Sequence, residues 1–176
     1  NVGIQRLCVH GRTLRQRYSG VADWDYITEV VDAVDTPVIA NGDVVDAKTA
    51  KACLSQTHAA GLMIGRGAIG RPAVFGEIKV GLGWMGREDL PWIAAYDGDW
   101  DELSYVAQQF ATRRWCWNRY IELARETTGL NLKSMRGHAV SFTKGLPSAK
   151  KIRNIMHGKQ SREEFAQATS EFLATN

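Results

Sequence analysis

The chain has 176 residues, of which 44% are hydrophobic and 23% are charged, with a formal net charge of +3. This composition supplies the core of one ordinary globular domain, or of a small domain with an appendage. No apolar run approaches the roughly 20 residues that span a bilayer, and the N-terminus lacks the basic and then apolar layout of a signal peptide. We therefore expect a cytoplasmic protein without a membrane partner.

The three cysteines do not form a recognisable ligand or disulfide pattern. Cys8, Cys53 and Cys116 are widely spaced, odd in number and outside any CxxC or histidine-containing arrangement. The sequence therefore indicates neither a disulfide framework nor a zinc site. We expect three buried thiols and no bound metal.

The first half of the chain alternates short apolar runs with amphipathic segments. Strands are expected over Gln5 to Val9, Pro37 to Ala40 and Leu62 to Ile64, and helices from Asp23 to Val34 and over Asp46 to Ser55. A helix or a turn is expected over Pro72 to Ile78. The order is β-α-β-α-β-α, and nearly continuous apolar strands are typical of a parallel sheet covered by helices. This pattern predicts an α/β fold with a ligand at the carboxyl ends of the strands.

Each expected strand is followed by an unusual loop. The loops are His10-Gly11-Arg12-Thr13, Asn41-Gly42-Asp43 and Gly65-Arg66-Gly67. The last two place glycine backbone and one guanidinium on adjacent strands, which suits a phosphate group. Each loop taken alone favours a simple tight turn, but the pair on adjacent strands favours phosphate binding.

The histidine and the arginines of the first loop each allow two interpretations. His10 is either a structural hydrogen-bonding residue or a donor to an oxygen of the ligand. Arg12, Arg15 and Arg17 either contact a polyanion that passes over the mouth of the site or are solvated surface residues.

The rest of the chain reads as a connection followed by helices. Residues 79–98 are expected to be a linker or a surface excursion. Capping boxes at Asp99 to Glu102 and at Ser161 to Glu164 are expected to open two helices, the first ended by Gly129 and the second carrying Phe165 and Phe172 on one face. Two further helices are expected, over Leu132 to Thr143 and over Ser148 to Met156. Together they predict a small helical bundle.

This helical part is strongly basic. Residues 1–112 hold 10 basic and 14 acidic side chains, whereas residues 113–176 hold 12 basic and 5 acidic ones. The asymmetry indicates either a polyanion partner or a solvated helical surface. Aromatic residues lie between the charges, and we expect Trp117 to belong to the core rather than to a base-stacking surface.

Several motifs together resemble the tRNA-dihydrouridine synthase family. His10-Gly11-Arg12-Thr13 is followed by Gln16, Tyr18, Gly20, Ala22, Asp23 and Trp24, then by Pro37-Val38-Ile39-Ala40-Asn41-Gly42-Asp43, and then by Met63-Ile64-Gly65-Arg66-Gly67-Ala68. In this order and spacing they are similar to the C-terminal half of the family's barrel. Arg136-x-His138 and Lys144-Gly145 resemble the family's helical domain, as a looser match.

The resemblance implies a function and a set of contacts. Such enzymes use FMN, reduced by NADPH, to reduce the C5–C6 bond of a uridine in tRNA. By this similarity, the residues expected to bind FMN are His10, Asn41, Gly42, Asp43, Gly65 and Arg66. The residues expected to contact RNA are Arg12, Arg15, Arg136, His138, Lys144, Lys150 and Lys151. The target base is expected to leave its stack to reach the flavin.

The same resemblance implies a division of the chain. We expect residues 1–78 to be the C-terminal part of an FMN-binding TIM (β/α)8 barrel with about three parallel βα units, 79–98 a linker, and 99–176 a basic helical tRNA-binding domain. The protein is expected to be monomeric.

The catalytic apparatus is expected to be incomplete in this chain. The family's general-acid cysteine and a lysine near the flavin lie in the other half of the barrel, and none of the three cysteines follows the family's catalytic motif. The chain also begins at Asn1 and enters a strand almost at once. We therefore expect part of a longer protein that keeps half of a flavin site and no catalytic residue.

Two other functions remain open. One is a different FMN-dependent TIM-barrel oxidoreductase that acts on a small molecule, for which the basic helices have no use. The other is a non-catalytic RNA-binding module in which the flavin loops are relics.

Overall fold

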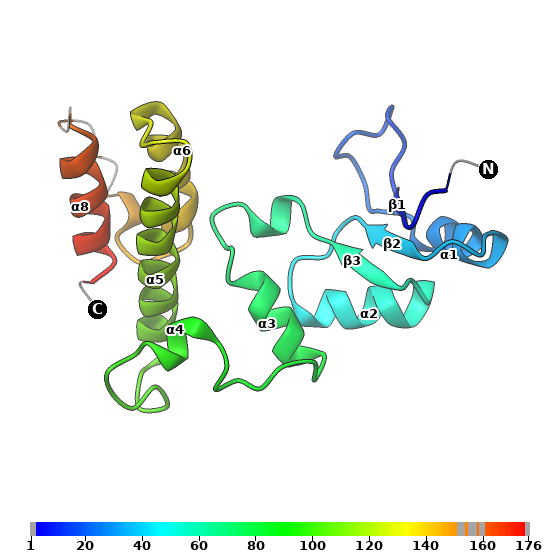
Figure 1. Ribbon diagram of the computed structural model, residues 1–176, viewed down its shortest axis with the longest axis horizontal. Coiled ribbons are helices and arrows are strands. Elements are labelled where there is room, and N and C mark those ends of the chain that lie inside the picture. Colours follow the sequence, from blue (N-terminus) through cyan, green and yellow to red (C-terminus); the bar gives the residue numbers. More distant parts are fainter. Residues whose placement is uncertain (1–2, 151–153, 155–157, 159–160, 175–176) are drawn as a thin grey trace. The chain divides into compact units, whose positions relative to one another are not determined.

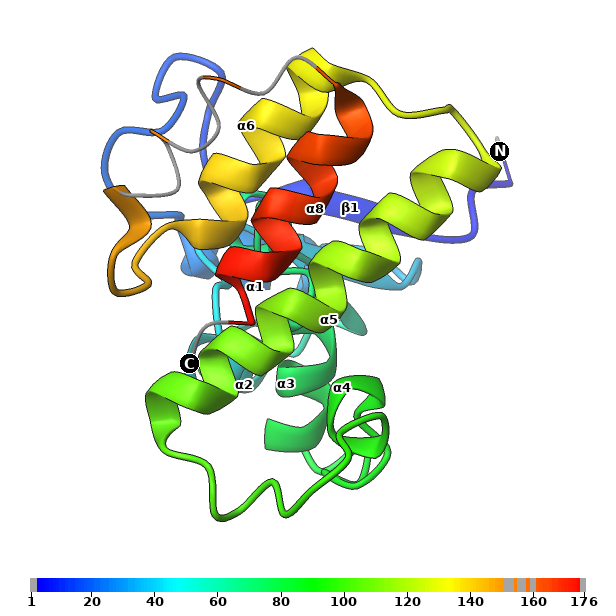
Figure 2. The same ribbon diagram turned by 90° about the vertical axis from the view of Figure 1, so that its left-hand side faces the viewer.

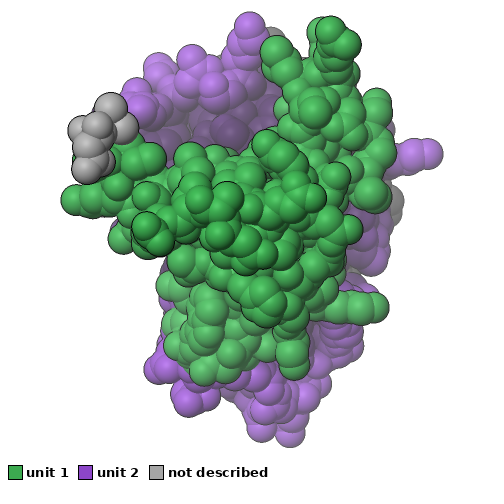
Figure 3. Space-filling model, turned by 90° about the vertical axis from the view of Figure 1, so that its right-hand side faces the viewer, with its two compact units in different colours: residues 1–68, 74–85 green, residues 69–73, 86–176 purple. Residues whose placement is uncertain are grey.

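The computed structural model describes residues 3–150, 154, 158 and 161–174. By their internal contacts they divide into two compact units, Asn1–Ala68 with Val74–Met85 and Ile69–Ala73 with Gly86–Asn176, which Figure 3 shows in different colours. We call them unit 1 and unit 2. No helix among the described residues is long and apolar enough to cross a membrane.

Unit 1 is built on a three-stranded parallel sheet (Figure 1). The strands β1 (Leu7–His10), β2 (Val38–Asn41) and β3 (Gly61–Met63) lie side by side in chain order. The elements between and after them are α1 (Trp24–Ala33), α2 (Ala47–Thr57), the 3₁₀ turn η1 (Arg66–Ala68) and α3 (Val74–Gly81). The predicted order of strands and helices is confirmed, with shifts of a few residues at the ends of elements.

The two helices between the strands begin at aspartates that cap them. Asp23 accepts a hydrogen bond from the amide of Tyr26. Asp46 accepts one from the amide of Thr49, and the Thr49 hydroxyl oxygen in turn accepts one from the Asp46 amide. These contacts satisfy backbone donors that the first turn of a helix leaves unpaired.

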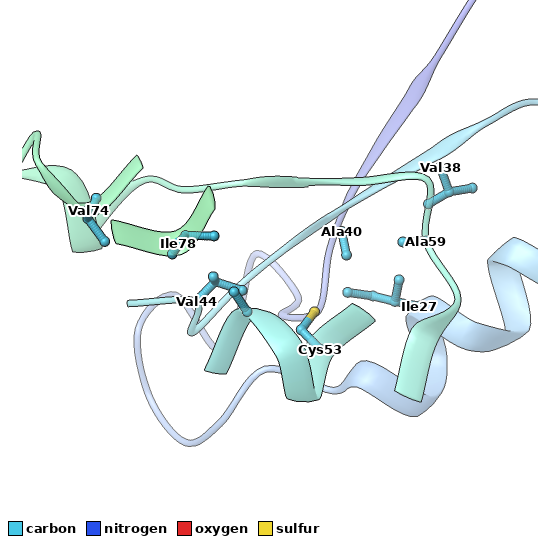
Figure 4. Packing of buried hydrophobic residues seen from close by; sticks show 9 residues of the cluster. Ile27, Val38, Ala40, Val44, Cys53, Ala59, Val74 and Ile78 are labelled. Atoms are coloured by element: carbon cyan, nitrogen blue, oxygen red, sulfur yellow. The ribbon is translucent and has the colours of Figure 1, made fainter. Parts of the chain in front are cut away.

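The core of unit 1 lies between the sheet and its helices. The side chains of Ile27, Ala40 and Cys53 are fully buried and point toward one another in Figure 4, with Val74 and Ile78 farther along the same cluster. Alternation along β1 places Leu7 and Val9 on this face and leaves Cys8 and His10 on the other.

One expectation about the cysteines is therefore wrong. Cys53 and Cys116 are buried, but Cys8 is exposed. Its strand is not buried on both faces, so a residue in an apolar run still reaches solvent when the alternation turns it away from the helices.

All the regular elements of unit 2 that the structure describes are helices. They are α4 (Pro91–Ala94), α5 (Tyr105–Glu126), α6 (Leu132–Thr143) and α8 (Arg162–Phe172). In Figure 2, α8 runs between α5 and α6, and it contacts both. Trp117 is fully buried, as predicted, and its indole N–H donates to the Ala166 carbonyl at 3.1 Å.

The sequence misplaces the start of the long helix. Its N-cap is Ser104, whose hydroxyl accepts from the Ala107 amide at 3.2 Å, and not the expected box at Asp99 to Glu102. Asp99 instead accepts a hydrogen bond from the amide of Asp101, two residues on, which makes a local turn.

Two other predicted segments differ from the structure or lie largely outside the described residues. Residues 79–98, expected as a linker, contain the end of α3 and the short helix α4, with Leu90 and Trp92 buried. The helix expected over Ser148 to Met156 falls largely outside the described residues, although Ala149 and Lys150 are helical.

Candidate functional site

A cavity of about 500 Å³ opens where the three strands of unit 1 end. Because the strands are parallel, the loops that follow them emerge at the same edge of the sheet. The cavity is lined by His10, Tyr18, Asn41, Gly42, Asp43, Val44, Val45, Met63, Gly65, Arg66 and Gly67. All six residues that the sequence proposes for a cofactor therefore lie around one cavity.

Asp43 joins the first two loops. One terminal nitrogen of Arg12, Nη2, lies 2.8 and 2.6 Å from the two carboxylate oxygens of Asp43, and the Ala22 amide donates to Oδ2 at 2.7 Å. Asp43 adopts a left-handed conformation with φ of 57°. Burial acts to raise the pKa of its carboxyl, but the hydrogen bonds from Arg12 and Ala22 and the charges of Arg12 and Arg66 outweigh it, so the pKa lies below its ordinary value.

The structure buries Arg12, whereas the resemblance leads us to expect an exposed contact with RNA. Its side chain is only 3% exposed, whereas a contact with RNA requires a guanidinium that faces solvent. The guanidinium pairs with Asp43 and also donates to the carbonyl oxygens of Ser19 and Gly20, at 3.3 and 2.7 Å. In this structure Arg12 braces the β1–α1 loop, and only Arg15 of the two proposed contacts in this loop is exposed.

Arg66 is the cation that faces the cavity. Its side chain is 49% exposed, and Nη2 lies 3.5 Å from Oδ1 of Asp43. Its guanidinium carbon lies 4.3 Å from the centre of the Tyr18 ring, within the range of a cation–π contact. An arginine held in this way can bind an anionic group through its remaining N–H donors.

His10 and Asn41 complete the polar lining at the strand ends. His10 Nδ1 lies 3.2 Å from the Asn41 carbonyl oxygen, and in the tautomer that donates this bond Nε2 is an acceptor. The side-chain amide of Asn41 donates to the Met63 carbonyl at 2.8 Å, which ties the end of β2 to the end of β3.

Gly42 lets these loops pack closely. Its φ is 129°, and a Cβ atom there would lie 2.6 Å from the Ala22 side chain and 3.1 Å from His10 Nδ1. Its carbonyl accepts a hydrogen bond from the Trp24 indole at 3.1 Å. Only glycine fits this position without moving the neighbouring loop.

The remaining proposed RNA contacts belong to unit 2. Arg136, His138, Lys144 and Lys150 are exposed, and Lys151 lies outside the described residues. His138 packs edge-on against Tyr120, whose pKa is raised by burial, with ring centres 5.0 Å apart. The helical spacing places Lys133, Arg136 and Val140 on one face of α6, and Lys144 is the C-cap residue that follows the helix.

Sequence reasoning missed two residues of the cavity lining that matter for its chemistry. Tyr18 belongs to the motif that resembles the family, but nothing in its spacing indicates that its ring packs on Arg66. The sequence predicts a strand at Met63, and its position beside Asn41 follows only from the strand register.

Comparison with known proteins places this arrangement in a family. A family model described as Dihydrouridine synthase (Dus) matches residues 1–176. The chain is 33% identical to a probable tRNA-dihydrouridine synthase of Rickettsia conorii over 178 residues, which cover 99% of this chain and 49% of that protein. It is 45% identical to a probable tRNA-dihydrouridine synthase of Rhodobacter capsulatus over 89 residues, 51% of this chain and 28% of that protein.

A third relative matches less than half of the chain's length. It is the tRNA-dihydrouridine synthase B of Yersinia pestis, 51% identical over 79 residues, which cover 45% of this chain and 25% of that protein. The chain spans about half the length, or less, of these relatives. Because the family model matches from the first residue to the last, this chain belongs to the dihydrouridine synthase family.

Proposed function

We propose that this chain is part of an FMN-dependent enzyme that reduces the C5–C6 bond of a uridine in tRNA. Its relatives are named tRNA-dihydrouridine synthases, and the motifs of the three loops resemble the family's flavin site. The single observation that carries the proposal is the cavity at the strand ends, because it gathers all six expected cofactor residues in unit 1.

The lining of the cavity fits the phosphate end of FMN. Arg66 supplies a positive charge, and the glycine-containing turns allow the backbone to approach a ligand closely. Asp43 also lines the cavity, but its carboxylate is matched by two arginines, which leaves one net positive charge in the group. We therefore assign the phosphate to Arg66 and the loop backbone at Gly42 and Gly65, with Asp43 as a counter-ion beside Arg66.

In this proposal, the other polar residues of the cavity orient the flavin. His10 and Asn41 lie at the ends of adjacent strands. We assign to them hydrogen bonds with oxygen or nitrogen atoms of the flavin. When bound, FMN would accept a hydride from NADPH and supply a hydride to the uridine. None of this chain's cysteines is assigned a catalytic role, and the general acid is proposed to lie outside Asn1–Asn176.

The architecture of the whole enzyme is part of the proposal. The three parallel βα units of residues 1–78 represent a segment of a TIM barrel, because three strands do not close a barrel of eight. Residues 99–176 form the basic helical domain that grips tRNA, and 79–98 connect the two. We also propose a monomeric, cytoplasmic enzyme that uses no metal.

The basic face of α6 supports a polyanion partner. Lys133, Arg136 and Lys144 recur at helical spacing, and all three residues are exposed. These like charges repel one another, and successive phosphates of a nucleic acid would neutralise them. The same face offers little to a small uncharged substrate.

The cofactor assignment is tested by flavin content. We expect the purified full-length gene product to contain FMN, and Arg66→Ala to lower its FMN occupancy because the phosphate loses its cation. Arg87→Ala is the matched control, since Arg87 pairs with Asp101 at the surface of unit 2. Unchanged FMN occupancy in Arg66→Ala would contradict the placement of the phosphate.

The RNA assignment is tested by the salt dependence of tRNA binding. Replacing Arg136 and Lys144 together by alanine should weaken binding, reduce the log–log salt slope by about two, and spare FMN. Lys79→Ala on α3 is the control. A slope near zero in the wild type would favour a small-molecule oxidoreductase, and tRNA binding without any flavin would favour a non-catalytic RNA-binding module.

A further inference from the structure

The guanidinium of Arg66 is held by two side chains from two different loops. Tyr18, in the β1–α1 loop, places its ring centre 4.3 Å from the guanidinium carbon. Asp43, after β2, places Oδ1 3.5 Å from Nη2. Tyr18, Asp43 and Arg66 all line the cavity at the strand ends.

The loop that carries Tyr18 is itself anchored on both sides of the ring. Before it, Arg17 donates its amide to the Thr13 carbonyl at 3.2 Å. After it, Arg12 donates to the carbonyl oxygens of Ser19 and Gly20. Because Arg12 is bound to Asp43, the same carboxylate holds Arg66 directly and the Tyr18 loop indirectly.

An arginine side chain that is half exposed ordinarily samples many rotamers, and a ligand must restrict them when it binds. Contacts made before the ligand arrives remove part of that cost and leave the guanidinium where the anion will lie. A flat aromatic face suits this purpose because it restrains the guanidinium plane without using its N–H donors.

We propose that Tyr18 is a positioning residue for Arg66, whose guanidinium its ring holds against Asp43 in the orientation that binds the ligand's phosphate. The proposal rests on the proposed function in that the phosphate is taken to be that of FMN. Tyr18 acts through Arg66 and does not itself contact the phosphate.

Two flavins that differ in their phosphate test this role. Fluorescence titration of the flavin-free full-length gene product should show that Tyr18→Leu weakens FMN affinity by about two- to fivefold, the range for an exposed cation–π contact. Affinity for riboflavin, which has no phosphate, should not change. Tyr18→Phe keeps the ring and should bind FMN as the wild type does, and Tyr26→Leu, an exposed tyrosine on α1, is the matched control.

A double substitution then separates positioning from direct contact. In an Arg66→Ala background, Tyr18→Leu should cause no further loss of FMN affinity, because there is no guanidinium left to hold. Additive losses would overturn the proposal, as would an equal loss of riboflavin affinity in Tyr18→Leu, because Tyr18 would then contact the flavin itself.

A measurement without flavin keeps this test separate from the proposed function. In the flavin-free full-length gene product, the Nε–H order parameter from ¹⁵N relaxation should be higher for Arg66 than for Arg15, and it should fall in Tyr18→Leu but not in Tyr18→Phe. An Arg66 side chain as mobile as Arg15 in the wild type would overturn the proposal even if FMN binds. Failure of the wild type to bind either flavin, with Arg66 ordered by Tyr18, would instead refute FMN as the ligand.

Discussion

The Asp43 carboxylate is shared by three groups from two other loops of the chain, the one after β1 and the one after β3. It accepts hydrogen bonds from Arg12 and from the Ala22 amide, and it lies beside Arg66. The Arg12 side chain is almost completely buried, and its Nη1 makes no hydrogen bond to any residue in the part of the chain that the structure describes. Arg12 therefore depends on Asp43 as its counter-ion.

Replacing this carboxylate should cost stability. We expect Asp43→Asn to lower the free energy of unfolding by about 2–3 kcal/mol at pH 7, because a buried guanidinium loses its anion. Urea denaturation of the chain measures the change. A loss below about 0.5 kcal/mol would show that the Arg12–Asp43 pair contributes no more than an exposed ion pair.

The pH dependence of that loss follows from the pKa of Asp43. Because its pKa is lower in the folded than in the unfolded chain, the stabilisation is complete above the unfolded value of about 4 and disappears as the pH falls through the folded value. The difference between wild type and Asp43→Asn should therefore stay constant from about pH 7 to pH 5 and shrink below about pH 4. A difference that grew on acidification would contradict the lowered pKa.

At the same scale, the sequence predicts which residues share the cavity but not how they pair. His10, Asn41 and Arg66 follow strand ends, and parallel strands bring such positions together whatever the details. The burial of Arg12 and the packing of Tyr18 on Arg66 depend instead on the path of one loop, which local spacing does not encode.

At the scale of elements, capping and apolar spacing decide most boundaries. α6 runs from Leu132 to Thr143 as its pattern predicts, with Asn131 as its N-cap. The start of α5 differs from the predicted one because Asp99 and Ser104 are both good N-cap residues, and the local sequence does not decide between them. Local propensity identifies possible N-cap residues but does not show which of two candidates, five residues apart, begins the helix.

Helix α6 also offers a simple gain in stability. Gly137 lies in its interior and is exposed, and a Cβ atom there meets nothing within 4 Å. Gly137→Ala should raise the free energy of unfolding by about 0.5–1 kcal/mol, because alanine loses less backbone entropy on folding. A higher urea midpoint with an unchanged slope would confirm it.

The matched control lies just beyond the same helix. Gly145 also has open space around its Cβ position, but its φ is 82°. Gly145→Ala should therefore destabilise the chain, because alanine disfavours this conformation. Equal effects of the two substitutions would mean that backbone conformation does not decide the outcome.

For the whole molecule, each compact unit has its own buried cluster. Ile27 is fully buried among the strands and helices of unit 1, and Phe165 is fully buried in unit 2. The α/β character of the first unit follows from its strand and helix pattern. The assignment of residues 69–73 to the second unit does not, since it reflects contacts distant in sequence.

A cavity made by substitution in one buried cluster should destabilise mainly the unit that contains it. Ile27→Ala, which removes about 2–4 kcal/mol of packing, should speed amide exchange in β2 and α2 more than in α5 and α8, and Phe165→Ala should do the reverse. Hydrogen exchange read by mass spectrometry measures both. If either substitution speeds exchange equally in both units, they unfold as one cooperative body.

The hydrogen bond between the Trp24 indole and the Gly42 carbonyl holds a fluorescent side chain beside the loop that follows β2. Gly42 lines the cavity, so Trp24 reports on the loop that a ligand would touch. Indole emission overlaps the absorption of oxidised flavins, and a flavin bound there should quench Trp24 by energy transfer. A Trp24→Phe variant, compared with the wild type, would then isolate the signal of this site from that of the other five tryptophans.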